Sequence, residues 1–144
     1  MNTLKLALEI DAPAHEVWRV LTDGELIREW ASAYAEGLAI HTNWKVGGKV
    51  SWRAPGGAVR ACGRLTDFQP DERLRFDYDE SPGAAHRNFS ETFEIKAGGR
   101  RTRLSMTTGP LDAATFEALT VPARRAMEEI RSLAEESAQI HRPR

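Results

Sequence analysis

Glycine and proline interrupt the middle of the chain at five places, and this punctuation limits the possible folds more than any other sequence feature. The interruptions are Gly47-Gly48, Pro55-Gly56-Gly57, Pro70-Asp71, Ser81-Pro82-Gly83 and Gly98-Gly99. These residue types mark turns, and such spacings are typical of short antiparallel strands joined by turns. We therefore predict an antiparallel meander over this part of the chain.

The segments beside these turns have the pattern of strands with one buried face. They read KVSWRA, VRACGRLTDF, RLRFDYD, FSETFEIKA and TRLSMTTG. In RLRFDYD, Leu74, Phe76 and Tyr78 alternate with arginines and aspartates, which is the period of a strand with one dry and one wet face. The opening segment TLKLALEI alternates in the same way, so we expect a further strand there.

Two short helices are expected between the first strand and the meander. Pro13 suits the first turn of a helix, where its missing N–H costs nothing, and an apolar stripe follows over residues 17–21. Thr22, with Glu25 three residues later, has the pattern of a capping box for a second helix that carries Trp30.

A long amphipathic helix is expected at the end of the chain. Asp112 can cap it, and Pro122 should either kink it or divide a first turn from its main body. Its apolar residues recur at spacings of three and four: Phe116, Leu119, Ala123, Met127, Ile130 and Leu133. This stripe needs an apolar surface to pack on. The elements together predict an α+β fold in which the long helix covers the dry face of the sheet.

The composition excludes several classes of function. The 144 residues suffice for one domain, and 20 basic against 21 acidic side chains give no attraction to nucleic acid. Cys62 is alone, and the histidines at 15, 41, 86 and 141 lack metal-ligand spacing, so we expect no disulfide, no metal and no cofactor. Without an export signal or a run of about 18 apolar residues, we expect a cytoplasmic protein with no membrane span.

The order and spacing of these features resemble those of a known superfamily. Ile10-x-Ala12-Pro13 leads into Val17-Trp18, Leu21-Thr22-Asp23 and Trp30, and then come Val46-Gly47-Gly48, the RLRF strand and TFEI…GGRRTRLSMT. The chain is similar to the START-like, or SRPBCC, helix-grip superfamily, and within it to the branch of the activator of heat-shock protein 90 ATPase. The resemblance covers nearly the whole chain, so we expect a single START-like (SRPBCC) ligand-cavity domain over residues 1–144.

The resemblance implies a curved seven-stranded antiparallel sheet wrapped around the C-terminal helix, with two short helices between strands one and two. It also implies an apolar cavity between sheet and helix, which in many members takes a lipid, a sterol, a polyketide or another hydrophobic molecule. Trp18 and Trp30 would belong to the small helices that close one end of the sheet. We expect only this domain, without the extra amino-terminal chaperone-binding domain of the eukaryotic activators.

Glu91 is a charged residue that the strand pattern directs toward the dry face. In NFSETFEI it alternates with Phe89, Phe93 and Ile95, and residues two apart share one face of a strand. A buried carboxylate must be neutralised, paired or placed in a wet cavity. Two alternatives stay open at this point: a bulge that turns Glu91 outward, and a structural ion pair with an arginine.

The other candidate ligand-binding residues lie on predicted dry strand faces or on the inner stripe of the last helix. With Glu91 they are Trp52, Phe76, Tyr78, Phe93, Met106, Thr108, Phe116, Leu119, Ala123 and Met127, and the candidates for the cavity mouth are Trp30 and Trp44. Core packing is the alternative for the apolar residues, and burial against a loop is the alternative for the two mouth tryptophans. Small Ala123 would leave room for a ligand.

Three functional hypotheses follow. The first is binding of a small hydrophobic or amphipathic ligand in the cavity, with Glu91, Tyr78 or Thr108 orienting one polar group. The second is a co-chaperone-like module that binds a chaperone through the outer sheet surface. The third is a cavity enzyme with Glu91 as general acid or base, although we assign no catalytic residue. A homodimer could form by pairing of edge strands.

Overall fold

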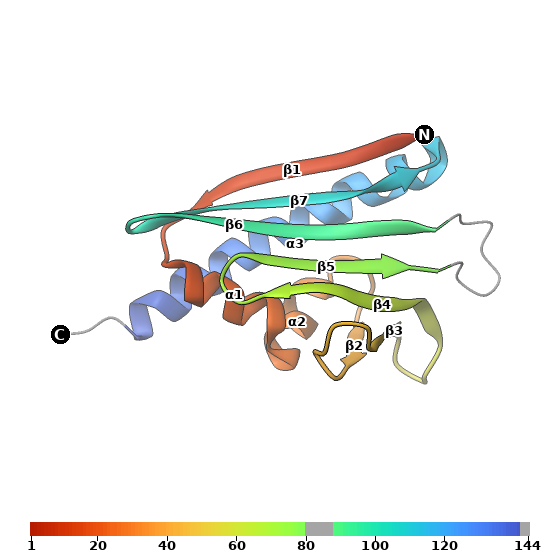
Figure 1. The fold of residues 1–144 in the computed structure, drawn as a ribbon, viewed down its shortest axis with the longest axis horizontal. Helices are drawn as coiled ribbons and strands as arrows, with labels where there is room; N and C mark the ends of the chain where they lie inside the picture. Colours follow the sequence, from red (N-terminus) through yellow and green to blue (C-terminus); the bar gives the residue numbers. More distant parts are fainter. Residues whose placement is uncertain (80–87, 142–144) are drawn as a thin grey trace.

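The computed structural model describes residues 1–79 and 88–141, and in them seven antiparallel strands form one sheet with a long helix across one face (Figure 1). The strands are β1 (Asn2–Ile10), β2 (Ala39–Thr42), β3 (Lys49–Arg53), β4 (Val59–Gln69), β5 (Arg73–Tyr78), β6 (Phe89–Gly98) and β7 (Arg101–Leu111). The helices are α1 (Ala14–Thr22), α2 (Gly24–Ala31) and α3 (Ala113–Ile140). The predicted turn at Ser81-Pro82-Gly83 and the histidine at position 86 lie outside the described residues.

The sheet order β1-β7-β6-β5-β4-β3-β2 confirms the predicted meander and the α+β helix-grip fold. Strands β2 to β7 follow one another in space, and β1 pairs with β7 at the far edge. The segment of β2, AIHT, is four residues long and has no fully buried residue. We did not predict β2 from its residues, because so short a strand carries no clear apolar period.

The boundary between α1 and α2 differs from the prediction. The Asp23 carboxylate accepts hydrogen bonds from the backbone N–H of Glu25 at 2.9 Å and of Leu26 at 3.2 Å. Thr22 ends α1 instead, and its hydroxyl donates to the carbonyl of Trp18 at 2.8 Å. The predicted capping box at Thr22 is therefore wrong, because Asp23 is the better-placed acceptor between two nearly continuous helices.

Helix α3 begins where the sequence indicated. Asp112 caps it, and its Oδ1 accepts from the backbone N–H of Thr115 at 2.7 Å. The helix continues through Pro122, so the predicted division into a first turn and a main body is wrong. Proline removes one backbone hydrogen bond, and the remaining bonds of this 28-residue helix carry it past that position. Within residues 1–79 and 88–141, none of the helices has the length and apolar character that crossing a membrane requires.

The far end of α3 is held to α1 around a buried carboxylate. Glu16 is 3% exposed, and its Oε2 lies 3.1 Å from Nδ1 of His141. Arg19 Nε lies 3.5 Å from the other carboxylate oxygen, and the Arg19 guanidinium also donates to the Ser137 hydroxyl. Burial raises the pKa of Glu16, but the hydrogen bonds and positive charges of these neighbours outweigh burial and hold the pKa below its ordinary value.

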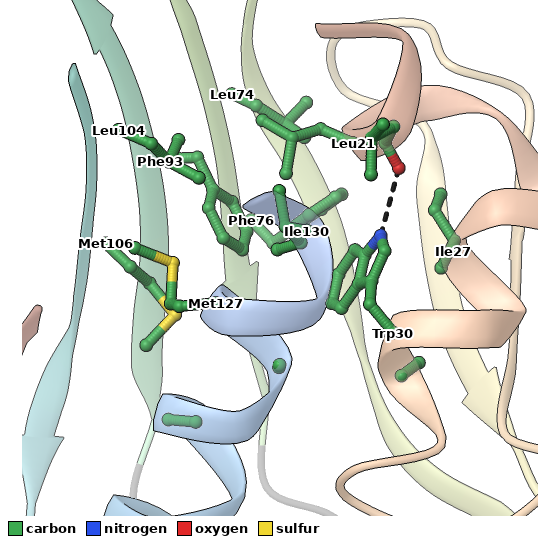
Figure 2. Packing of buried hydrophobic residues seen from close by; sticks show 14 of the residues in the cluster. Leu21, Ile27, Trp30, Leu74, Phe76, Phe93, Leu104, Met106, Met127 and Ile130 are labelled. Carbon is green, nitrogen blue, oxygen red and sulfur yellow. Dashed lines mark hydrogen bonds between the residues drawn. The ribbon is translucent and has the colours of Figure 1, made fainter. Parts of the chain in front are cut away.

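The core lies between the inner sheet face and the helices. Figure 2 shows Phe76 and Phe93 of the sheet beside Met127 and Ile130 of α3, with Trp30 of α2 closing one side. Along β5 buried residues alternate with half-buried ones, as predicted for a sheet with one dry face.

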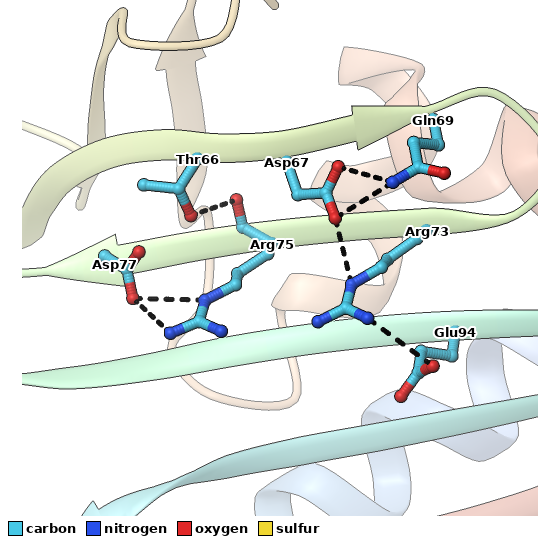
Figure 3. A network of polar contacts seen from close by, with 7 residues as sticks. All are labelled: Thr66, Asp67, Gln69, Arg73, Arg75, Asp77 and Glu94. Atoms are coloured by element: carbon cyan, nitrogen blue, oxygen red, sulfur yellow. Dashed lines mark hydrogen bonds and ion pairs between the residues drawn. The ribbon is translucent and has the colours of Figure 1, made fainter.

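The outer face of the sheet carries a network of ion pairs across β4, β5 and β6 (Figure 3). Arg73 Nε lies 3.0 Å from Oδ2 of Asp67, and its Nη1 lies 3.9 Å from Oε2 of Glu94. Arg75 pairs with Asp77 at 3.1 Å. This is therefore the wet face, and α3 covers the opposite one.

Candidate functional site

A cavity of about 540 Å³ lies between the inner sheet face and the first half of α3. Its walls come from three parts of the chain: the sheet strands, the segment from α2 to β2, and the helix α3. The residues that line it are Leu4, Trp30, Tyr34, Ala35, Leu38, Trp52, Arg60, Ala61, Tyr78, Phe89, Glu91, Thr108, Ala114, Thr115, Ala118, Leu119, Pro122 and Ala123. The volume and the mainly apolar walls are those of a small-molecule site.

The space exists because the first half of α3 presents small side chains to the sheet. Ala114, Ala118 and Ala123 line the cavity, and each projects only a methyl group. Further along the helix Met127 and Ile130 are fully buried and fill the corresponding space. The change from small to large residues along one helix therefore makes a cavity at one end and a packed core at the other.

Glu91 points into this cavity from β6. It pairs with Phe76 of β5 and with Thr108 of β7, and both registers run through β6 without a bulge. Its Oε1 accepts a hydrogen bond from the Tyr78 hydroxyl at 3.1 Å. Among the described residues no arginine pairs with it. The structure thus disfavours both alternatives to an inward carboxylate, the bulge and the ion pair.

The hydrogen bonds at this site run in one direction. The indole N–H of Trp52 can only donate, and it donates to the Tyr78 oxygen at 2.9 Å. Tyr78 has a single hydroxyl hydrogen, which it gives to Glu91. The Glu91 carboxylate is the final acceptor in this series of hydrogen bonds.

Burial sets the ionisation of these groups. Desolvation raises the pKa of Glu91 to about 7, and the hydrogen bond from Tyr78 opposes part of that rise. Burial, followed by the nearby charge of Glu91, raises the pKa values of Tyr34 and Tyr78, so both phenols stay neutral. A carboxyl group with a pKa near 7 changes charge within the physiological range, and it could also give or accept a proton.

Thr108 supplies a second polar group beside Glu91. It is 3% exposed and lines the cavity from the neighbouring strand β7. Its hydroxyl has no hydrogen-bond partner among the residues that the structure describes. A buried hydroxyl without a partner is uncommon, because such a group loses its bonds to water on folding.

Seven of the thirteen predicted site residues line the cavity: Trp30, Trp52, Tyr78, Glu91, Thr108, Leu119 and Ala123. Six do not line it: Trp44, Phe76, Phe93, Met106, Phe116 and Met127. All of these except Trp44 and Phe116 are fully buried in the packed core, whereas Trp44 and Phe116 are half-buried against it. Residues of one dry face divide between core and cavity because the first half of α3 lines the cavity, whereas Met127 and Ile130 in its second half are buried in the core.

Of the two tryptophans predicted at the cavity mouth, Trp30 lines the cavity and Trp44 does not. Trp30 is 3% exposed and forms part of the inner wall, where its indole N–H donates to the carbonyl of Val20 at 2.9 Å. Trp44 packs on Phe68 and Phe76, with ring centroids 6.1 Å and 6.5 Å apart. Trp44 therefore packs on residues of β4 and β5, and not against a loop as the alternative proposed.

Several lining residues were not predicted. Phe89 shares the alternation of Glu91 in NFSETFEI, so the strand period could have found it. The small residues of AATFEALTVPA, at the start of α3, are a second signal. Tyr34 and Leu38 lie between α2 and β2, where no period exists to indicate which side chains point inward.

Comparison with known families and structures agrees with this architecture. A family model described as "Activator of Hsp90 ATPase homolog 1-like protein" matches residues 11–135. No curated protein matches the chain.

Solved structures share the fold at low sequence identity. A crystal structure of a Mesorhizobium loti protein is 18% identical over 94% of this chain and 98% of its own, with a TM-score of 0.80. The solution structure of the Aha1 dimer from Colwellia psychrerythraea is 14% identical over 94% and 97%, with a TM-score of 0.73. An HSP90 activator from Plasmodium falciparum is 18% identical over 77% and 74%, with a TM-score of 0.61.

Proposed function

We propose that this chain, which belongs to the Activator of Hsp90 ATPase homolog 1-like family, binds a small amphipathic molecule between its sheet and α3. The observation that carries the proposal is the cavity of about 540 Å³, whose mainly apolar walls enclose the carboxylate of Glu91. Burial of the ligand's apolar surface would supply affinity, at about 25 cal/mol per Å² before the costs of association. Glu91, Tyr78 or Thr108 would orient its polar end. Lipids, sterols and polyketides are the ligand classes that we favour.

The proposal is tested by measuring binding to a protein whose cavity is filled. Extraction and mass spectrometry of the purified protein, with thermal unfolding against fatty acids, sterols, flavonoids and aromatic polyketides, would identify a ligand. Ala123 is fully buried and lines the cavity, so Ala123→Phe would place a ring in the ligand's space. We expect this substitution to weaken binding by at least about tenfold, the equivalent of about 1.4 kcal/mol.

Arg125→Phe is the matched control, because it adds the same ring on the exposed side of the same helix. This variant should bind the ligand as the wild type does. Equal affinity of wild type and Ala123→Phe for every ligand found would contradict binding in this cavity.

A second function, stimulation of a chaperone ATPase, is favoured by the family and by the likeness to the Plasmodium falciparum HSP90 activator. The candidate surface is the outer sheet face with Arg73 and Arg75. Its ion pairs are partly exposed and contribute little to stability, so they are free to exchange for contacts with a partner. Homodimer formation through the edge strands β1 and β2 also stays a prediction.

In a purified Hsp90 ATPase assay, this second function predicts stimulation by the wild type and its loss in the double variant Arg73→Glu, Arg75→Glu. Reversing two charges on the docking face should reduce stimulation by about tenfold or more, since charge juxtaposition across an interface costs several kcal/mol. Ala123→Phe should stimulate normally, because its change is internal. An unchanged ATPase rate with the wild type would count against this function.

A further inference from the structure

The polar end of the cavity has a hydrogen-bonding pattern that restricts which chemical group fits there. The Tyr78 hydroxyl donates to Oε1 of Glu91, and Trp52 donates to Tyr78. The indole hydrogen of Trp52 and the hydroxyl hydrogen of Tyr78 are therefore both used within the protein. Among the described residues the other carboxylate oxygen, Oε2, accepts no hydrogen bond. The site consequently presents an unused acceptor to a ligand.

Thr108 adds an unused hydroxyl beside this acceptor. Thr108 and Glu91 are direct partners in the pairing of β6 with β7, and both line the cavity. The Thr108 hydroxyl is buried and lacks a partner within residues 1–79 and 88–141. Since a hydroxyl can donate as well as accept, a group placed between the two residues can satisfy both of them.

The surrounding walls favour a flat apolar ring behind that group. Trp30, Trp52, Tyr34, Tyr78 and Phe89 all line the cavity. Aromatic side chains contact planar molecules over a large area through stacked or edge-to-face geometry. The ring systems of these residues and the polar pair of Glu91 and Thr108 therefore belong to one binding site.

We propose that the cavity takes a neutral ring compound with a hydroxyl group, which donates to Oε2 of Glu91 and accepts from the hydroxyl of Thr108. This inference rests on the proposed ligand-binding function and names the recognised group. When Glu91 is ionised, as it mostly is at pH 7.5, a carbonyl or ether could accept from Thr108 but would face the lone pairs of the carboxylate. A ligand carboxylate would meet a like charge. An ammonium group could donate to Glu91 but, having no lone pair, could not accept from the hydroxyl of Thr108.

A matched pair of probes tests this pattern: 2-naphthol and 2-methoxynaphthalene share one ring system, and only the first carries a donor. Titration calorimetry at pH 7.5 should show 2-naphthol binding about tenfold more tightly to the wild type, as expected for a hydrogen bond to a charged acceptor. Thr108→Val and Glu91→Leu should each bring the affinity ratio of the two probes toward one. Thr108→Ser, which keeps the hydroxyl, should preserve the ratio.

The outcomes separate this inference from the function on which it rests. Equal binding of both probes to the wild type would overturn the hydroxyl preference and leave a general apolar site. The same ratio in the wild type and in both Thr108→Val and Glu91→Leu would overturn the roles of Glu91 and Thr108. If neither probe binds, this inference is overturned. The proposed function would fall only if Ala123→Phe also leaves the binding of every other ligand unchanged. Circular dichroism and melting curves confirm that each variant is folded.

Discussion

Replacing Glu91 with Gln is expected to stabilise the unliganded protein by about 3 kcal/mol at pH 8 and to change its stability little below pH 4. Burial raises the pKa of Glu91 from 4.5 to about 7, and a tenfold change in proton affinity corresponds to about 1.4 kcal/mol. The folded protein holds this proton more tightly than the unfolded chain. Stability is therefore lost as the pH rises from about 4.5 to about 7, and the loss is complete above that range.

The substitution is informative because Gln resembles the protonated form of Glu in shape and charge. Its amide oxygen can still accept the hydrogen bond from Tyr78, so the variant removes the charge and little else. Urea unfolding of both proteins at several pH values would give the difference in unfolding free energy. Glu94→Gln is the control for a charge removed from the exposed face of the same strand. A difference for Glu91→Gln that does not grow with pH would contradict the prediction.

The ionisation of Glu91 connects the stability of the fold to ligand binding. An ionised Glu91 destabilises the empty fold, because water has been replaced by apolar walls and, among the described residues, by one hydrogen bond. A ligand that donates to the carboxylate would restore part of this stability by binding the folded state alone. Glu91 thus lowers the stability of the empty protein, and a complementary ligand would offset part of that cost.

The fold was predictable because its main elements repeat a clear apolar period. Alternation identified β5 and β7, and spacings of three and four identified α3 and the side that it buries. The cap at Asp23 and the short strand β2 were missed, since one residue decides the first and four residues form the second. So few residues do not distinguish one cap position from the next, or a short strand from a loop.

The candidate site was predictable only in part. The period of β6 directed Glu91 inward, and the same reasoning placed Tyr78 and Thr108 on inner faces. The period did not separate cavity residues from core residues, so Phe93 and Met106 were chosen together with Trp52. That separation depends on which side chains of α3 lie opposite each strand position, and a strand's own sequence does not contain this information.

Trp30→Ala is expected to lower the free energy of unfolding by about 4 kcal/mol, within the range measured for large aromatic residues removed from cores. The Trp30 ring lies 6.1 Å from both Trp52 and Phe93 in edge-to-face contacts. Its indole N–H donates to the Val20 carbonyl, so it also joins α2 to α1 (Figure 2). Alanine would lose these contacts and enlarge a cavity that Trp30 already lines.

Two further variants separate the contributions of the Trp30 ring and its N–H group. Trp30→Phe keeps an aromatic ring but leaves the Val20 carbonyl without its donor, so we expect a loss of about 1 to 2 kcal/mol. Trp44→Ala, at a half-buried position, should cost less than Trp30→Ala because a smaller part of its ring is removed from water. Urea unfolding monitored by circular dichroism would rank the three proteins. If Trp44→Ala were as destabilising as Trp30→Ala, the packing of α1 and α2 on the sheet would not depend specially on Trp30. The residues around Trp30 would then hold that wall of the cavity in place without it.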